Sequence, residues 1–485
     1  MRVCRLWYTT VTGIWARLNL GTTTPKNVVT SKLERNQWFL DISIDTESDR
    51  DHLTPVTPSE RAYGAIFAAI QATSQWRTFV IETFPSHADL PEQIVNHRLQ
   101  QCSDAALSRL RTFKINSACE MSPLLDRLLR ILGTTASGEL TTVEIHSGSV
   151  VSFLIPAYSS IFHSLKSLYI DAPRLDSPVD LLPHLHQLEG LTLVRLSLPI
   201  YDNDVNLPFV HTLRHVVLKY VSIQWMSGRI FYALESCTIF LPLRQPLLYE
   251  FSTTLPNCNY LVFCGYPLDK LSGISAPNLD HLSVTCAGEH KPQGSNQLVR
   301  FSSQALQVSR LTPRILHISI EAMTWAWIKA LAFMSRLEEL QINNAEPSSL
   351  GVKVLQSLVV HQVHADVIGT TAIPVGWNTP VCPSLKRFRL RYRRWLRSSE
   401  YFDLIPEFIS IIWSRQQSGI PLQSFYVWKN TDQEHPVELI EGSWISLKGF
   451  EWLANDRERN LLQLMAGRLV GNMAKRPGKP SATAG

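Results

Sequence analysis

A six-residue pattern recurs along this chain and limits the folds that it can adopt. The pattern is an apolar residue, two variable residues, a second apolar residue, one variable residue and a third apolar residue. It is clearest at Leu165–Ile170, Leu188–Leu193 and Leu279–Val284. Further copies begin at Leu213, Leu234, Cys258, Leu337, Leu385, Leu422 and Leu447, and weaker ones at Trp76, Leu110, Leu140, Ile315 and Leu355.

The geometry of a β-strand explains how this pattern builds an apolar core. The second and third apolar residues are two apart, so on a strand they face the same side and can fill a core. Between 140 and 279 the copies begin at 140, 165, 188, 213, 234, 258 and 279, which is the spacing of leucine-rich repeats. One unit cannot bury its apolar face alone, but stacked neighbours form a continuous core. We therefore expect an α/β fold, an irregular leucine-rich-repeat solenoid of horseshoe type, over residues 33–455.

The segments between the predicted strands carry signals for helices. Thr57-Pro58-Ser59-Glu60 combines a Thr cap, a Pro at the first helical position and a Glu at the third, which predicts a helix running towards Gln75. Ser122 and Pro123 open a second helix. A third is expected over Phe402–Gln417, ended by Gly419.

Composition restricts the class of protein. With 45% hydrophobic and 18% charged residues among 485, the chain is expected to be globular rather than disordered. No apolar stretch is long enough for a membrane span, and the N-terminus lacks the features of a signal peptide. The eight cysteines show no disulfide framework, which favours the reducing cytosol or nucleus. Residues 473–485 are expected to form a disordered basic tail.

The first twenty residues contain a recognisable motif. Val3, Cys4 and Trp7 are followed by an Ile14-Trp15 pair that leads into an apolar segment. This arrangement resembles the second half of an F-box, as found in the F-box/leucine-rich-repeat proteins of basidiomycete fungi. Residues 1–20 are therefore interpreted as a partial, F-box-like helical cap.

The resemblance implies a function and a partner. The segment Trp38–Ile44 is similar to the strand that follows the F-box in these fungal proteins. In that family the F-box docks on a Skp-type adaptor of a cullin–RING (SCF-type) ubiquitin ligase, and the repeats select the client protein. The adaptor-facing residues would be Val3, Cys4, Trp7, Ile14 and Trp15. The Leu-Pro-x-Glu helix that opens the family's F-box would lie before Met1, so we expect the N-terminal half of the F-box to be missing and much of the adaptor contact with it.

Motifs for catalysis are not found in the sequence. We find no dinucleotide-binding, P-loop, zinc-protease or serine-hydrolase signature. The close histidine pairs, His184/His186 and His361/His364, have no neighbouring cysteines or carboxylates to complete a metal site. The expectation is a non-catalytic protein with no cofactor and no metal.

One predicted strand is strongly basic. Residues 386–397 hold seven basic side chains and no acidic one. Alternation places Phe388, Leu390 and Tyr392 in the core, and directs Arg387, Arg389, Arg391 and Arg393 to the opposite face. The next predicted strand places Ser424, Tyr426 and Trp428 at matching outward positions, and the preceding one offers Ser357, Val359 and His361.

This cluster suggests a docking surface. Arginine binds carboxylate and phosphate groups in a bidentate manner, and Tyr and Trp add contact area at low entropic cost. The hypothesis is a client-binding patch for an acidic or phosphorylated protein segment, formed by Arg387, Arg389, Arg391, Arg393, Tyr426 and Trp428. The alternative is a solvated basic strand face that prevents aggregation at an edge. One basic patch on a nearly neutral chain argues against nucleic acid as the partner.

Two functions are consistent with these observations. The first is an F-box-like receptor that presents clients to a ubiquitin ligase. The second is a leucine-rich-repeat interaction scaffold with no connection to ubiquitination.

Overall fold

The computed structural model shows an α/β protein with a large, mostly parallel β-sheet and few helices among its described residues. The chain divides into two compact units, residues 1–242 with 253–256, and residues 243–252 with 257–485. The residues that the structure describes are 17–20, 26–35, 40–45, 76–83, 109–117, 139–147, 163–171, 181–196, 198, 201, 205–241, 251–264, 273–285, 311–319, 331, 334–345, 358, 381–392, 398–428, 436–441, 444–446 and 448–449.

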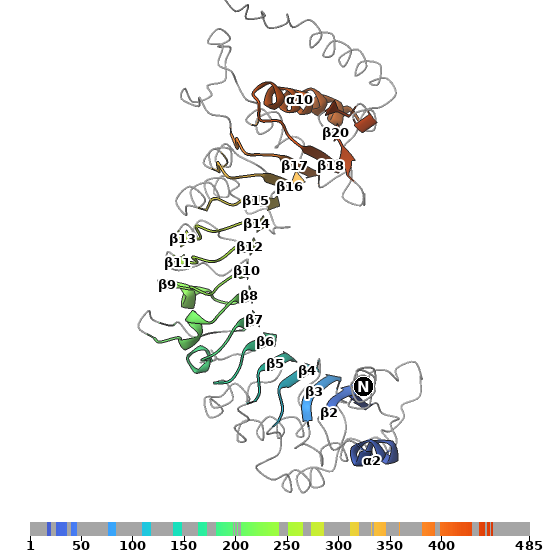
Figure 1. Ribbon diagram of the computed structural model, residues 1–485, viewed down its shortest axis with the longest axis vertical. Coiled ribbons are helices and arrows are strands. Elements are labelled where there is room, and N and C mark those ends of the chain that lie inside the picture. Colours follow the sequence, from blue (N-terminus) through green and yellow to red (C-terminus); the bar gives the residue numbers. More distant parts are fainter. Residues whose placement is uncertain are drawn as a thin grey trace, which may run out of the picture. The chain divides into compact units, whose positions relative to one another are not determined.

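In the first unit, parallel strands follow one another across the sheet in sequence order (Figure 1). Connectors between them include a helix, α2 (Lys26–Arg35), and the short 3₁₀ turns η4 (Leu182–His184), η5 (Pro208–His211) and η6 (Gln224–Met226). Strands β9 (Arg229–Ile230) and β11 (Ser252–Thr254) pair in a second small sheet. The main strands are β1 (Arg17–Leu20), β2 (Leu40–Asp45), β3 (Trp76–Thr83), β4 (Thr112–Ser117), β5 (Thr142–Ser147), β6 (Ser167–Asp171), β7 (Gly190–Val194), β8 (His215–Lys219) and β10 (Ser236–Phe240).

In the second unit the order is equally sequential, and the last strand is antiparallel to its neighbour. The long helix α10 (Ser398–Gln417) connects β17 to β18. Short strands β13 (Gly273–Ser275), β20 (Ile440–Glu441) and β21 (Trp444–Ile445) lie outside the main sheet. The main strands are β12 (Tyr260–Cys264), β14 (His281–Thr285), β15 (Ile315–Ser319), β16 (Glu339–Ala345), β17 (Arg387–Tyr392), β18 (Ser424–Trp428) and β19 (Val437–Glu438).

Most strands expected from the six-residue pattern are present where the pattern placed them. Wherever the structure describes both, the second and third apolar residues of a copy are buried, as at Leu168 and Ile170 of β6 or Phe388 and Leu390 of β17. The first apolar residue, such as Leu165, is buried as well. Complete burial of one such side chain contributes about 1.5–3 kcal/mol. Stacked leucines, isoleucines and valines therefore provide the main driving force for the sheet.

Two strand predictions are wrong. Leu358, expected in a strand that begins at Leu355, is helical and buried. Lys448 and Gly449, expected in a strand that begins at Leu447, are helical too. A short apolar run has the same composition on a buried strand and on a buried helix turn, so the pattern alone does not separate them.

The residue before most of the main strands from β5 to β18 forms a repeated backbone contact. Its amide and the next amide both donate to one carbonyl oxygen of the preceding rung, as Lys166 and Ser167 do to Thr141, at 2.9 Å each. Glu189 and Gly190 donate in the same way to Lys166 at 2.8 Å. Because only backbone atoms take part, this contact is independent of the outward side chains.

The expected helix over Phe402–Gln417 is confirmed as part of α10. Gly419 follows it with a φ of +75°, a conformation that glycine adopts without steric cost. The amide of Ile420 closes the helix end on the carbonyl of Arg415 at 3.0 Å. The helices expected after Thr57 and Ser122, the basic tail and residues 1–16 of the F-box-like segment lie outside the described residues. The last four residues of that segment, Arg17–Leu20, form strand β1 rather than part of a helical cap. Within the described part of the chain, no helix is both long and apolar enough to span a membrane.

Candidate functional site

The basic strand and the aromatic strand are direct neighbours. Strand β17 pairs in parallel with β18, and the register places Arg389 opposite Tyr426 and Arg391 opposite Trp428. The guanidinium carbon of Arg389 lies 6.0 Å from the centre of the Tyr426 ring, a separation at which a cation and an aromatic ring attract. The adjacency on which the client-binding hypothesis depends is therefore present.

The strand faces agree with the expected alternation. Phe388, Leu390 and Tyr392 are completely buried, Arg387 and Arg389 are half-buried, and Arg391 is exposed. Arg393, the fourth arginine of the hypothesis, lies outside the described residues.

The other neighbour of β17 differs from the expectation. Strand β16 pairs with β17, and it places Glu339 opposite Arg387 and Gln341 opposite Arg389. Helical Leu358 occupies the stretch where the preceding strand was expected, and the outward residues named there, Ser357, Val359 and His361, lie outside the described residues. The basic strand is therefore bordered by an acidic side chain.

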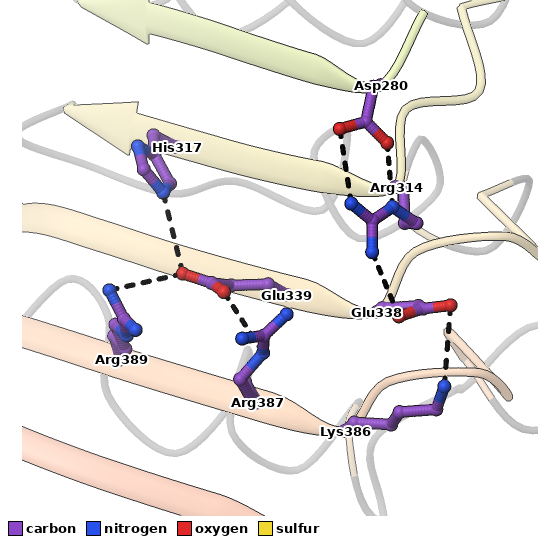
Figure 2. Close-up of polar contacts among 8 residues, drawn as sticks. All are labelled: Asp280, Arg314, His317, Glu338, Glu339, Lys386, Arg387 and Arg389. Atoms are coloured by element: carbon purple, nitrogen blue, oxygen red, sulfur yellow. Dashed lines mark hydrogen bonds and ion pairs between the residues drawn. The ribbon is translucent and has the colours of Figure 1, made fainter.

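Glu339 forms the centre of a polar cluster (Figure 2). Its side chain is only 6% exposed, and its carboxylate contacts both neighbouring arginines. Oε2 lies 3.1 Å from Nε of Arg387, and Oε1 lies 3.2 Å from Nη1 of Arg389. A buried carboxylate is stable only when it is paired, and here two arginines supply the pairing.

A histidine faces the same carboxylate from β15. Nε2 of His317 lies 3.7 Å from Oε1 of Glu339, which is too far for a hydrogen bond. This nitrogen is shielded from solvent and has no hydrogen-bond partner among the described residues. Burial lowers the pKa of His317 below its ordinary value of 6.5, with the Glu339 carboxylate opposing the shift and Arg389 adding to it.

Aromatic side chains continue from His317 across the next two strands. The ring of His281 on β14 meets the ring of His317 edge-on, with centroids 4.5 Å apart. The ring of Tyr260 on β12, which is 41% exposed, lies 4.7 Å from that of His281. Burial, with His317 next, lowers the pKa of His281. The outward face of the second unit thus carries aromatic and basic groups from β12 to β18.

Tyr426 has an acidic neighbour on its other side. Strand β19 places Glu438 opposite Tyr426, and the tyrosine hydroxyl donates a hydrogen bond to this carboxylate. Burial, followed by Glu438, raises the pKa of Tyr426 above 10.0. We call Arg387, Arg389, Arg391, Tyr426 and Trp428 the arginine–aromatic face; with Glu339 and Glu438 beside it, its three positive charges meet two negative ones.

A second set of charges lies at the start of the strands. Arg314 contacts Asp280 at 2.6 Å and Glu338 at 3.5 Å, and Lys386 contacts Glu338 at 3.4 Å. Figure 2 shows that this set is separate from the Glu339 cluster, although Glu338 and Glu339 are adjacent in sequence. These side chains are 26–45% exposed, and ion pairs so exposed contribute about 0–1 kcal/mol each.

The ion pairs at the starts of the strands were not predicted, although the sequence contains a signal for them. The residue after the first apolar position alternates in charge over several copies of the pattern. Lys166 contacts Glu189 at 3.0 Å, and Arg214 contacts Glu235 at 3.4 Å in the same arrangement. The alternation predicts such pairs once the strands are known to stack in sequence order.

Helix α10 positions β17 through a buried arginine. The side chain of Arg415 is fully buried, and its guanidinium donates to the carbonyl oxygens of Val381, Cys382 and Leu385 at 3.2, 2.8 and 3.3 Å. Leu385 comes two residues before β17 begins. Cys382, in this turn, has a φ of +51° and is buried, and burial raises the pKa of its thiol to about 12. The contact fixes the turn from which the arginine strand starts.

Metal-ligating clusters and the adaptor-facing residues are the last features considered in the sequence. Among the described residues, no three His, Cys, Asp or Glu side chains come together to hold a metal ion. The adaptor-facing residues Val3, Cys4, Trp7, Ile14 and Trp15 lie outside the described part of the chain.

Comparison with known proteins gives no family. The chain matches none of the protein-family models, and no curated protein matches it at a significant level. Function must therefore be argued from the site itself.

Proposed function

We propose that this protein is a non-catalytic recognition scaffold, a leucine-rich-repeat solenoid whose outward strand face binds an acidic or phosphorylated segment of a client protein. The observation that carries this proposal is the register of β17 and β18, which sets Arg389 and Arg391 beside Tyr426 and Trp428. Arginine provides bidentate recognition of anionic groups, and the aromatic rings provide rigid contact area.

The geometry of the arginine–aromatic face supports partner binding rather than catalysis. The exposed group of this face is a guanidinium, which remains protonated at all accessible pH values and transfers no proton. Its aromatic neighbours supply surface rather than a nucleophile. A surface of this kind selects a partner by charge and shape.

Binding to a labelled peptide tests the proposal. A short fluorescein-labelled peptide rich in glutamate, with and without a central phosphoserine, is titrated with the full chain and followed by fluorescence anisotropy. The double variant Arg389→Gln with Arg391→Gln should weaken binding at least about tenfold, because two charge-assisted hydrogen bonds are lost. Gln is preferred to Glu because Glu339 lies 3.2 Å from Arg389.

A matched control separates this face from overall charge. The double variant Arg111→Gln with Arg214→Gln removes the same charge from exposed positions of the first unit, and its affinity should equal that of the unmodified chain. Equal weakening by the two double variants would mean that the peptide follows net charge, and would overturn the proposed site.

The proposal extends to a ubiquitin ligase through the resemblance of residues 1–20 to an F-box. Under this extension a Skp-type adaptor would bind Val3, Cys4, Trp7, Ile14 and Trp15, and the arginine–aromatic face would hold the client. A pull-down with purified fungal Skp-type adaptor tests it, with the Trp7→Ala and Trp15→Ala double variant as control. Capture that this variant abolishes would support the ligase role. Absence of capture would leave the interaction scaffold as the function.

A further inference from the structure

The contacts of Glu339 lead to an inference that rests on the proposed function. Oε1 of this carboxylate forms an ion pair with Nη1 of Arg389 at 3.2 Å and also faces Nε2 of His317. The carboxylate therefore lies between two possible donors on opposite sides, one on β17 and one on β15. It is bound to the first and lies 3.7 Å from the second.

While Glu339 is paired with it, Arg389 cannot offer both terminal nitrogens of its guanidinium to a client. An end-on bidentate contact with an anion uses both terminal nitrogens of the guanidinium. Glu339 occupies one of them, Nη1. The anion of a client must therefore compete with a carboxylate that the chain itself supplies at the same atom.

We propose that Glu339 is an internal competitor for the client's anionic group, and that His317 receives the Glu339 carboxylate when a client displaces it from Arg389. The carboxylate has only a short distance to move, because Oε1 already faces the imidazole. Nε2 of His317 gains the hydrogen-bond partner that it lacks among the described residues. Arg387, which holds Oε2 at 3.1 Å, retains its contact and keeps the displaced carboxylate paired.

Proton uptake follows from this exchange. A carboxylate at hydrogen-bond distance stabilises the protonated imidazole, so the pKa of His317 is higher in the complex than in the free chain. The complex therefore binds more protons, and affinity increases as the pH falls through the pKa that His317 has in the complex. The groups that face His317 are His281 from β14, Glu339 from β16 and Arg389 from β17.

The first test removes the competitor. Glu339→Gln keeps the shape of the side chain but lacks the charge, and it should bind the glutamate-rich peptide about three- to tenfold more tightly than the unmodified chain. The matched control is Glu338→Gln, which removes the same charge one residue away from the separate cluster with Arg314 and Lys386. Its affinity should not change.

The outcomes distinguish this inference from the proposed function. If the unmodified chain binds the peptide and Glu339→Gln binds equally or less tightly, internal competition is wrong while the docking face stands. If Glu338→Gln gains as much as Glu339→Gln, net charge explains the gain and the inference is again wrong. If neither the unmodified chain nor Glu339→Gln binds, both the inference and the proposed function fail.

The second test does not depend on a variant of Glu339. Affinity for the unphosphorylated peptide is measured between pH 8 and pH 6, where its glutamates stay ionised. Affinity should rise as the pH falls, and His317→Gln should remove most of this rise, whereas His281→Gln should retain it. A rise that His317→Gln leaves unchanged would show that His317 does not receive the carboxylate. An affinity that is constant with pH in the unmodified chain would show the same.

Discussion

The two units have the same backbone design, but their outward faces carry charged residues in different arrangements. In the first unit charged residues form one-to-one ion pairs: Lys114 contacts Glu144 at 2.5 Å, and Arg195 contacts Asp171 at 2.6 Å. In the second unit Arg387 and Arg389 of β17 share the carboxylate of one residue of β16, Glu339. The buried positions are filled by the same kinds of apolar residue in both units.

Under the proposed function, fold and recognition therefore depend on separate sets of positions. Along each strand, inward residues stabilise the sheet and outward residues are free to vary. Variants can therefore alter one set and leave the other in place, and three experiments test the comparison in order of decreasing effect.

The largest effect is expected from the core, and it should be equal in both units. Leu168→Ala on β6 and Leu340→Ala on β16 each remove a fully buried side chain, and each should lower the free energy of unfolding of its own unit by about 2–5 kcal/mol. Urea denaturation, followed by hydrogen exchange of the backbone amides in each unit, measures the free energy of unfolding of the two units separately. A much smaller loss in one unit would show that the shared design does not give them comparable cores.

The next effect is specific to the second unit. Arg415→Ala leaves the carbonyls of Val381, Cys382 and Leu385 without this buried donor, and should cost about 2–4 kcal/mol of stability. Arg415→Lys, which keeps the charge but not the planar fork, should give an intermediate loss. Hydrogen exchange should show the loss around β17 and α10. Unchanged protection there would contradict the role assigned to Arg415.

The smallest effect concerns the paired charges of the first unit. Burial opposes ionisation of Glu144, but hydrogen bonds from Lys114 and His146 outweigh it and lower the pKa of Glu144 below 4.5. Its contribution to stability is therefore present above pH 4.5 and is lost as the pH falls through the lowered pKa. Lys114→Met should raise the pKa, as measured by NMR titration of labelled glutamate. An unchanged midpoint would mean that the contact is not maintained in solution.

Much of the fold could be predicted from the sequence, because the six-residue pattern reports directly on buried positions. It located strands such as β6, β7, β14 and β17, and alternation then assigned the faces of β17. The pairing of β17 with β18 followed from sequence order. The long segment between β16 and β17 caused the main error, because Leu358 belongs to an apolar run that satisfied the strand pattern although this residue is helical.

Glu339 and Arg415 were also missed, and each had a signal. Glu339 belongs to the copy that begins at Leu337, and its outward position there would have placed it beside Arg387 once β16 was taken as the neighbouring strand. Arg415 lies seven residues after Phe408 and four after Ile411, on the apolar side of α10. An arginine at such a position indicates a buried guanidinium. Its carbonyl partners depend on the tertiary fold and are not visible in local patterns.

The backbone contact at the start of most main strands from β5 to β18 has an evolutionary consequence. Two successive amides donate to one carbonyl of the preceding rung from Arg111 to Lys386, and none of these atoms belongs to a side chain. Each rung, meaning a strand with the turn before it, is thus joined to its neighbour independently of its outward side chains. Under the proposed function, gene duplication or recombination that exchanged one rung for another would change the outward residues, and with them the client, while the backbone contact between neighbouring rungs was kept.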